Sequence, residues 1–195
     1  PVTIGPVRYN YGDVLITELM IDPIPVRLLA ESEYLELYNN SNLDVLLSNL
    51  VLELNNVTYD LPPYLLQPGQ YVVLSKDTLV GGLLLEAFSS LGNDKFNLAL
   101  KNNDGSLIHE IRFDSHNYSD SDFGGGVSLE LQNRKQFCYA SSFDYSSDYS
   151  GGTPGRANSS EKELIESRLL FQTDEYLSWS HPVFLSEGTL SITDL

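Results

Sequence analysis

The sequence predicts an all-β fold, an immunoglobulin-like antiparallel β-sandwich. Three observations lead to this prediction. Apolar and polar residues alternate with period two along much of the chain, and helical periodicity is nearly absent. Turn-forming residues separate the alternating stretches at short intervals. The 195 residues include 42% apolar and 19% charged residues, which is enough apolar material for a self-sufficient core.

The first half of the chain contains three stretches with strand character. Residues 14–20 are apolar on both faces except for Thr17 and Glu18, which indicates an interior strand. Residues 34–38 alternate, with Leu35 and Leu37 on one face and Tyr34, Glu36 and Tyr38 on the other. The next stretch places Leu50, Leu52 and Leu54 on one face. These strands are expected to pack their leucines inward.

Turn signals fix the connections that follow. Asn55-Asn56 supplies two residues that tolerate positive φ, so we expect a tight hairpin into residues 57–60. Pro68-Gly69 fits the central positions of a type II turn before a strand at residues 71–75. A second hairpin turn is expected at residues 102–105, which are rich in Asn, Asp and Gly.

The second half continues the pattern. Residues 96–100 alternate, and the returning strand at 107–113 is expected to place Leu107, His109, Ile111 and Phe113 on one face. Ile108, Glu110 and Arg112 would then share the other face. After the run of three glycines, residues 127–131 alternate again. Six inward residues should meet in one core, namely Leu35, Leu37, Leu52, Leu98, Ile111 and Leu129.

Charge and chain organisation exclude several classes of protein. A formal net charge of -16 argues against a nucleic-acid partner, because phosphate binding needs a basic surface. The apolar runs are too short for a membrane span.

The chain begins with Pro1 and its one methionine is Met20, so we expect a fragment or a processed product. We expect residues 1–12 to be a linker or leading strand, 13–158 the main domain, and 159–195 a further segment with a linker.

Several short motifs, taken in order, resemble a known family. The first three are residues 14–20 followed by Asp22-Pro23, residues 33–39, and residues 66–74. Later matches are residues 103–105, 125–130 and 150–155, with Asn158. Together they cover about residues 13–158 and resemble the lamin tail domain in its bacterial form. The resemblance implies an immunoglobulin-like β-sandwich that serves as a non-catalytic accessory module in large secreted or surface proteins of Bacteroidetes-type bacteria.

The chain departs from the bacterial pattern at two positions. Val127 and Phe143 stand where that pattern tends to have tryptophan. Both replacements are apolar, so the core should survive, whereas an aromatic surface built on these positions is put in doubt. Residues 178–192 are similar to the opening of a second bacterial immunoglobulin-like domain, so 159–195 is expected to be a linker and the start of such a domain.

The sequence offers few residues that could form a catalytic site. A nucleophilic triad needs a histidine, and the chain offers only His109, His116 and His181. We expect His109, on an apolar strand face, to be a hydrogen-bonded structural residue, and Cys138 to be a small buried hydrophobe. Glu18 and Glu36 could face each other across a sheet as a glycosidase pair does. Because a sandwich strand supplies no cleft, we do not expect this pair to be catalytic.

Two groups of side chains are candidate ligand sites. Asp114, Asp120 and Asp122 lie in one loop, where hard oxygen ligands suit Ca²⁺, although a solvated acidic loop is the simpler interpretation. Tyr139, Tyr145 and Tyr149 could form an aromatic platform for sugar or peptide, although tyrosine is also common at sandwich edges. No other cofactor is expected, because the sequence has no nucleotide-binding glycine motif and no zinc spacing.

These observations lead to one functional hypothesis and two alternatives. The first is a non-enzymatic spacer, adhesion or protein-interaction module in a larger bacterial cell-envelope or secreted protein. The second is a glycan- or protein-binding module whose loops are ordered by Ca²⁺, and the third is the targeting domain of a secreted hydrolase. The expected partner is a protein or glycan on or near the cell surface, and the expected location is extracellular, on the cell surface or in the periplasm.

Overall fold

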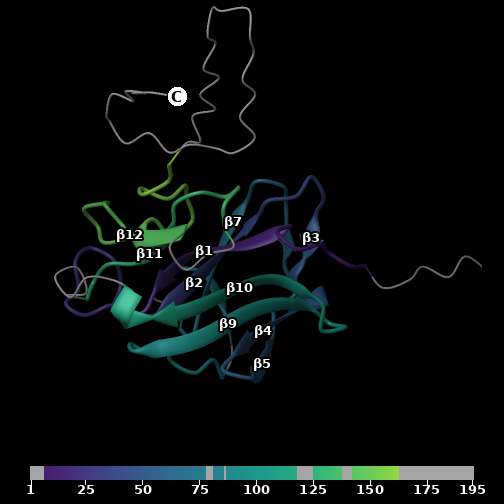
Figure 1. Cartoon of the computed structure of the whole chain (residues 1–195), viewed down its shortest axis with the longest axis horizontal. Coiled ribbons are helices and arrows are strands. Elements are labelled where there is room, and N and C mark those ends of the chain that lie inside the picture. The colour runs from purple at the N-terminus through teal and green to yellow at the C-terminus, as the bar shows by residue number, and fades with distance from the viewer. Residues whose placement is uncertain (1–6, 78–80, 86, 118–124, 138–141, 163–195) are drawn as a thin grey trace, which may run out of the picture. The chain divides into compact units, whose positions relative to one another are not determined.

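The fold is taken from a computed structural model of the chain, which describes residues 7–77, 81–85, 87–117, 125–137 and 142–162. The described part is a β-sandwich with two main sheets (Figure 1). The predicted all-β class with antiparallel sheets is therefore confirmed. Among the described residues, no helix has the length and apolar character that a membrane crossing requires.

The first sheet has six strands in the order β12-β11-β1-β2-β7-β8. They are β1 (Val14–Met20), β2 (Tyr34–Asn39), β7 (Tyr71–Ser75), β8 (Leu83–Leu84), β11 (Leu129–Leu131) and β12 (Phe143–Tyr145). All neighbours pair antiparallel except β7 and β8, which are parallel. Strands from the two ends of the described chain thus share one sheet.

The second sheet has four antiparallel strands in the order β10-β9-β4-β5. They are β4 (Leu50–Leu54), β5 (Val57–Asp60), β9 (Lys95–Asn102) and β10 (Leu107–Asp114). A small third sheet pairs β3 (Val45–Leu46) with β6 (Leu65–Leu66). Short 3-10 helices lie at Leu47–Asn49 and Ser115–Asn117.

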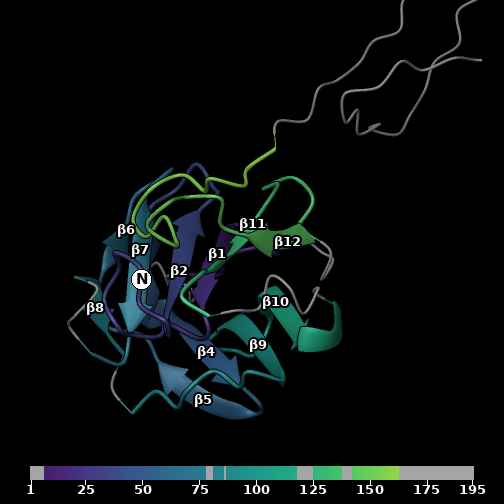
Figure 2. The same cartoon turned by 90° about the vertical axis from the view of Figure 1, so that its left-hand side faces the viewer.

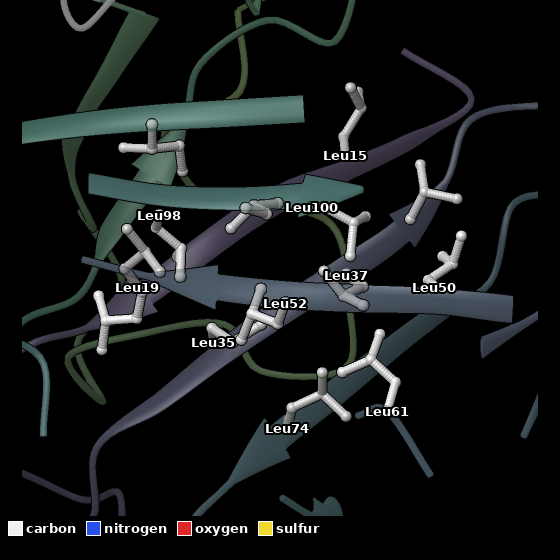
Figure 3. Packing of buried hydrophobic residues seen from close by; sticks show 14 of the residues in the cluster. Leu15, Leu19, Leu35, Leu37, Leu50, Leu52, Leu61, Leu74, Leu98 and Leu100 are labelled. Carbon is white, nitrogen blue, oxygen red and sulfur yellow. The ribbon is translucent and has the colours of Figure 1, made fainter. Parts of the chain in front are cut away.

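The hydrophobic core lies between the two main sheets. Leu35, Leu37 and Leu74 approach it from the six-stranded sheet, and Leu52 and Leu98 meet them from the four-stranded sheet (Figure 3). All six residues predicted to share one core belong to it, so that prediction is confirmed. Phe143, which replaces a tryptophan of the bacterial pattern, is also buried there.

The predicted turns have the expected backbone. Asn55 and Asn56 have φ values of 49° and 69°, which fit the two-residue hairpin between β4 and β5. Gly69 has a φ of 75°, and the Gln70 N–H donates to the Gln67 carbonyl at 3.0 Å across the turn before β7. Both turn predictions are confirmed.

One predicted strand face is wrong at its start. The alternation placed Leu107 inward and Ile108 outward, but Ile108 is fully buried and Leu107 is only half-buried. The register between β10 and β9 shifts between Leu107 and His109, which identifies a bulge. A bulge adds one residue to a strand, so the alternation changes phase there. His109, Ile111 and Phe113 keep the predicted inward face.

The compact unit that contains the sandwich runs to Glu161, and a second unit begins at Lys162. Described residues 7–12, expected as a linker or leading strand, contain no strand. Tyr9 is nevertheless buried: its N–H donates to Asn102 Oδ1 at 3.0 Å, and Asn102 Nδ2 donates to the Tyr9 carbonyl at 2.9 Å. This exchange fastens the leading segment to the end of β9. Of residues 159–195, expected to be a linker and the start of a second domain, all beyond residue 162 lie outside the described residues.

Candidate functional site: a buried carboxylate cluster

Three glutamates lie side by side on adjacent strands of the six-stranded sheet. Glu18 on β1 is the register partner of Glu36 on β2 and of Glu130 on β11. The sequence-based expectation that Glu18 and Glu36 face each other is confirmed. All three residues are fully buried. On β2 the alternation places Glu36 opposite to Leu35 and Leu37, so the cluster lies on the outer face of this sheet.

The segment that buries them, which we call the strap, consists of residues 151–160. It lies on the side of the six-stranded sheet that faces away from β4 and β9 (Figure 1 and Figure 2). Each glutamate accepts one backbone N–H from the strap. Thr153 N–H donates to Glu18 Oε1 at 2.8 Å, Gly155 N–H to Glu36 Oε2 at 2.6 Å, and Ser160 N–H to Glu130 Oε2 at 2.7 Å.

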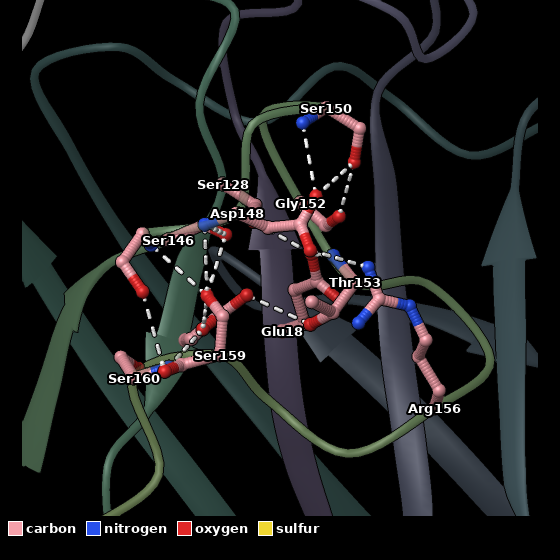
Figure 4. A network of polar contacts seen from close by, with 12 residues as sticks. Glu18, Ser128, Ser146, Asp148, Ser150, Gly152, Thr153, Arg156, Ser159 and Ser160 are labelled. Atoms are coloured by element: carbon pink, nitrogen blue, oxygen red, sulfur yellow. Dashed lines mark hydrogen bonds and ion pairs between the residues drawn. The ribbon is translucent and has the colours of Figure 1, made fainter.

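Hydroxyl groups supply further donors to the cluster (Figure 4). The hydroxyls of Tyr34 and Ser128 each donate to Glu18 Oε1 at 2.6 Å. Thr153 Oγ1 donates to Glu130 Oε1 at 2.7 Å, and Ser159 Oγ donates to Glu130 Oε2 at 2.9 Å. Thr17 Oγ1 lies 2.8 Å from Glu36 Oε1. The described donors to the three carboxyl groups are all uncharged.

Burial favours the protonated forms of Glu36 and Glu18. Loss of solvation raises the pKa of Glu36 to about 8, and the neighbouring charge of Glu18 adds to this increase. Burial also raises the pKa of Glu18, against the opposing effect of the hydrogen bonds from Ser128 and Tyr34. The pKa of the Tyr34 phenol is raised well above its usual value by burial and by the charge of Glu18. Glu36 is therefore mostly neutral at pH 7.

The strap fits the cluster closely. A side chain at Gly152 would place its Cβ 2.6 Å from both Glu18 Oε1 and the Tyr34 hydroxyl oxygen, so any other residue would have to displace these hydrogen-bonded groups. Asn158 Nδ2 donates to the carbonyls of Thr17 and Leu131, each at 2.9 Å. This side-chain amide therefore bridges β1 and β11 just beyond their paired residues.

A second set of contacts closes the loop that leads into the strap. Asp148 accepts the Ser150 hydroxyl at 2.6 Å and forms an ion pair with Arg156 at 2.6 Å. These hydrogen bonds hold the pKa of the Asp148 carboxyl well below its usual range. Arg156 is therefore occupied by Asp148 at the surface and does not donate to a carboxyl group of the cluster.

The predicted structural role of His109 is confirmed. The imidazole is fully buried, its Nδ1 accepts the Ile16 N–H at 2.9 Å, and its Nε2 lies 3.2 Å from the Phe137 carbonyl. Since Nδ1 accepts, Nε2 carries the proton and donates. Burial lowers the pKa of His109 to about 4, so the ring is neutral at pH 7. Cys138 and His181 lie outside the described residues.

The candidate calcium residues are only partly described. Asp114 is the last residue of β10, where its carboxylate pairs with Lys95 at 2.9 Å and with the exposed His116 at 3.0 Å. The bond from Lys95 contributes most to lowering the pKa of Asp114 to about 2. Asp120 and Asp122 lie outside the described residues. Within the described ranges, no three His, Cys, Asp or Glu residues are arranged to hold a metal ion. The calcium site stays a prediction.

The candidate tyrosines lie in different environments. Tyr145 belongs to β12 and packs half-buried against the core, whereas Tyr149 exposes 85% of its surface. Tyr139 lies outside the described residues. A shared aromatic platform likewise stays a prediction.

The residues that sequence reasoning missed are Glu130 and its strap partners Thr153, Ser159 and Ser160. Glu130 and Thr153 belong to two of the motifs that carry the family resemblance, residues 125–130 and 150–155. Glu18, Glu36 and Asn158 belong to other such motifs, and the fold brings all of them together around the cluster. The shared motifs were the available signal, although they did not show what the residues contact.

Comparison with known proteins identifies the family. The family model described as Lamin Tail Domain matches residues 8–118, which is more than half of the chain. No curated protein matches the chain. The matched range includes the whole four-stranded sheet and β1, β2, β7 and β8 of the six-stranded sheet. The structure adds β11, β12 and the strap to the same unit. Lamin tail domains are immunoglobulin-like modules, in agreement with the fold. The chain therefore belongs to the lamin tail domain family.

Proposed function

We propose that this chain is a non-enzymatic accessory module that acts as a spacer, adhesion or protein-interaction domain in a larger bacterial protein. The parent protein would be secreted or belong to the cell envelope, with its partner a protein or glycan at or near the cell surface. Membership of an immunoglobulin-like module family supports this role. The source in Bacteroidetes-type bacteria and the location outside the cytoplasm are parts of the same proposal.

The observation that carries the proposal is that the buried carboxyl groups bind the protein's own backbone. A glycosidase pair must reach a substrate in a cleft. Glu18 and Glu36 are instead fully buried, and each accepts a backbone N–H of the strap. His109, the buried histidine, is likewise occupied by two backbone groups. These groups stabilise the fold, which is what an accessory module needs.

An exposed apolar loop that is anchored by a backbone hydrogen bond favours the protein-interaction form of this role. Ile24, Val26 and Leu28 expose 55%, 47% and 68% of their surface. The loop that carries them is held in place, because Gly126 N–H donates to the Asp22 carbonyl at 2.7 Å. A preorganised apolar loop loses little entropy when it binds a partner.

Catalytic assay tests the absence of enzymatic function. The full chain and Glu18→Gln are compared on a panel of glycoside, ester and peptide substrates. We expect turnover at the background rate from both proteins. Turnover by the native chain that is lost in folded Glu18→Gln would overturn the proposal.

Two measurements separate a spacer from a calcium-dependent glycan binder. A spacer should give no signal on a glycan array in the presence or absence of Ca²⁺. Its melting temperature should also respond equally to CaCl₂ and to NaCl of matched ionic strength. A calcium-specific rise that Asp120→Asn with Asp122→Asn abolishes, together with array binding, would favour the glycan-binding module.

A further inference from the structure

Among the described residues, no cationic side chain donates a hydrogen bond to the three carboxyl groups beneath the strap. Their bonding partners in the described structure are backbone N–H groups and hydroxyls. A buried carboxylate without a cation is strongly disfavoured, and three on adjacent strands also repel one another. The geometry alone therefore favours retention of a proton within the cluster.

The titratable groups around the cluster do not remove the preference for a retained proton. Tyr34 on β2 donates to Glu18 and has a raised pKa, so it stays neutral. The half-buried tyrosines Tyr38 and Tyr71 face the same side from β2 and β7, and burial raises the pKa of Tyr71 to about 12. Two cations near the strap are paired with other acids: Arg156 with Asp148, and Arg134 with Glu161, both at 2.6 Å.

We propose that the cluster is a proton-dependent clamp, in which a proton on Glu36 keeps the strap closed over the six-stranded sheet and loss of that proton releases it. Opening would leave the sandwich core folded, because the leucines of the core lie on the opposite face of the sheet. The clamp is a conformational property of the module and does not depend on its proposed role.

The contacts of Glu36 suit its protonated form. A proton on Oε1 can be donated to Thr17 Oγ1, 2.8 Å away, since a hydroxyl can also accept. Oε2 remains free to accept the Gly155 N–H at 2.6 Å. The neutral acid therefore satisfies both contacts without adding a buried charge.

Ionisation of Glu36 places a second negative charge opposite Glu18. Opening the strap relieves this repulsion at the lowest cost, because water then reaches the carboxylates while the strand ladders remain intact. The raised pKa of Glu36, about 8, gives the direction of the change. Closure is favoured while Glu36 is protonated and is lost as the pH rises through about 8.

Hydrogen exchange on the full chain tests the clamp. We would measure protection factors for the amides of Thr153 and Gly155 between pH 6.5 and 9, corrected for the intrinsic pH dependence of exchange. In the native chain they should fall at least tenfold, while the Leu52 amide in β4 keeps its protection. Glu36→Gln mimics the neutral acid, since its amide NH₂ can face Thr17 and its oxygen can accept from Gly155. This variant should keep the strap protected at pH 9.

Glu110→Gln on β10 is the matched control, since Glu110 is partly exposed and lies on the four-stranded sheet; it should behave as the native chain does. Constant protection in the native chain, or the same decrease in Glu36→Gln, would overturn the proposal. If Glu36→Gln does not fold, the ¹³C shift of the Glu36 carboxyl in the native chain decides. Its titration midpoint must coincide with the loss of strap protection, and titration near pH 4.5 overturns the clamp.

Discussion

Glu18 and Glu36 lie directly opposite each other on β1 and β2, and neither residue is exposed to solvent. They lie on the face of the six-stranded sheet that does not contribute to the main core. The strap covers this face and binds both carboxyl groups through the backbone of Thr153 and Gly155. The sheet is therefore buried on both sides along this stretch, with an apolar contact on one side and a polar contact on the other.

The polar contact between the strap and the six-stranded sheet can be tested by removing the Thr153 hydroxyl. Thr153→Val keeps the shape of the side chain but loses the donor to Glu130 Oε1. Because a buried carboxyl group then lacks a hydrogen bond, the free energy of unfolding should fall by about 1–3 kcal/mol. Thr153→Ser keeps the hydroxyl and should retain more of the stability. Equal losses for the two variants in urea unfolding would show that this hydrogen bond does not matter.

Truncation of the inward leucines tests the apolar contact. Leu35→Ala or Leu98→Ala removes a fully buried side chain from the core. Each should destabilise the fold by about 2–5 kcal/mol in denaturant unfolding. Leu43→Ala is the control, because Leu43 exposes 71% of its surface, and its effect should be within about 0.5 kcal/mol. Losses below about half a kcal/mol at the core positions would mean that the strand faces are misassigned.

Alanine substitutions at two glycines with positive φ distinguish the cost of backbone strain from the cost of a steric clash. Gly125 and Gly105 have φ values of 74° and 86°. A Cβ at Gly125 would lie 1.6 Å from the Ile24 carbonyl oxygen, whereas a Cβ at Gly105 meets nothing within 4 Å. Gly105→Ala should therefore cost only the strain of a left-handed residue, about 1 kcal/mol. Gly125→Ala should cost at least about 2 kcal/mol more. Similar losses of unfolding free energy would argue against the close approach at Gly125.

The lowered pKa of His109 predicts how the free energy of unfolding depends on pH. Its pKa is lowered to about 4 by burial, whereas an unfolded histidine titrates near 6.5. The unfolded chain therefore binds the proton first as the pH falls, so stability is complete above pH 6.5 and decreases toward pH 4. The full effect is about 3 kcal/mol. His109→Gln cannot titrate and should lack this part of the decrease between pH 7 and pH 4, as measured by urea unfolding at each pH. An identical pH profile would contradict the neutral buried ring.

The sequence predicted the core better than it predicted the outer face. Alternation identified Leu52 and Leu98 because an inward residue recurs at every second position, and Asn55-Asn56 identified its hairpin because both residues tolerate positive φ. The bulge at Ile108 escaped detection, because one added residue changes the phase of the alternation without changing its composition.

The strap could not be predicted from local pattern. Thr153 contacts Glu18 across 135 positions of sequence, and no periodicity relates two residues so far apart. Alternation correctly placed Glu36 on the face opposite its inward leucines, and that face of a sandwich sheet is usually exposed to solvent. Alternation does not show which segment covers an outer face, so it did not predict that Glu36 is buried. The ordered family motifs held the relevant residues, but only the fold shows that they meet.

Truncation of the chain at two points tests most directly the central claim that the strap is an integral part of the sandwich. A chain ending at Glu161 keeps every strap contact to Glu18, Glu36 and Glu130, whereas a chain ending at Ser150 removes them all. The longer product should unfold cooperatively in urea at pH 7. The shorter product should keep the folded core but have a lower free energy of unfolding, because the hydrogen bonds that the strap donates to the three glutamates are lost. Equal unfolding free energies for the two products would contradict the account.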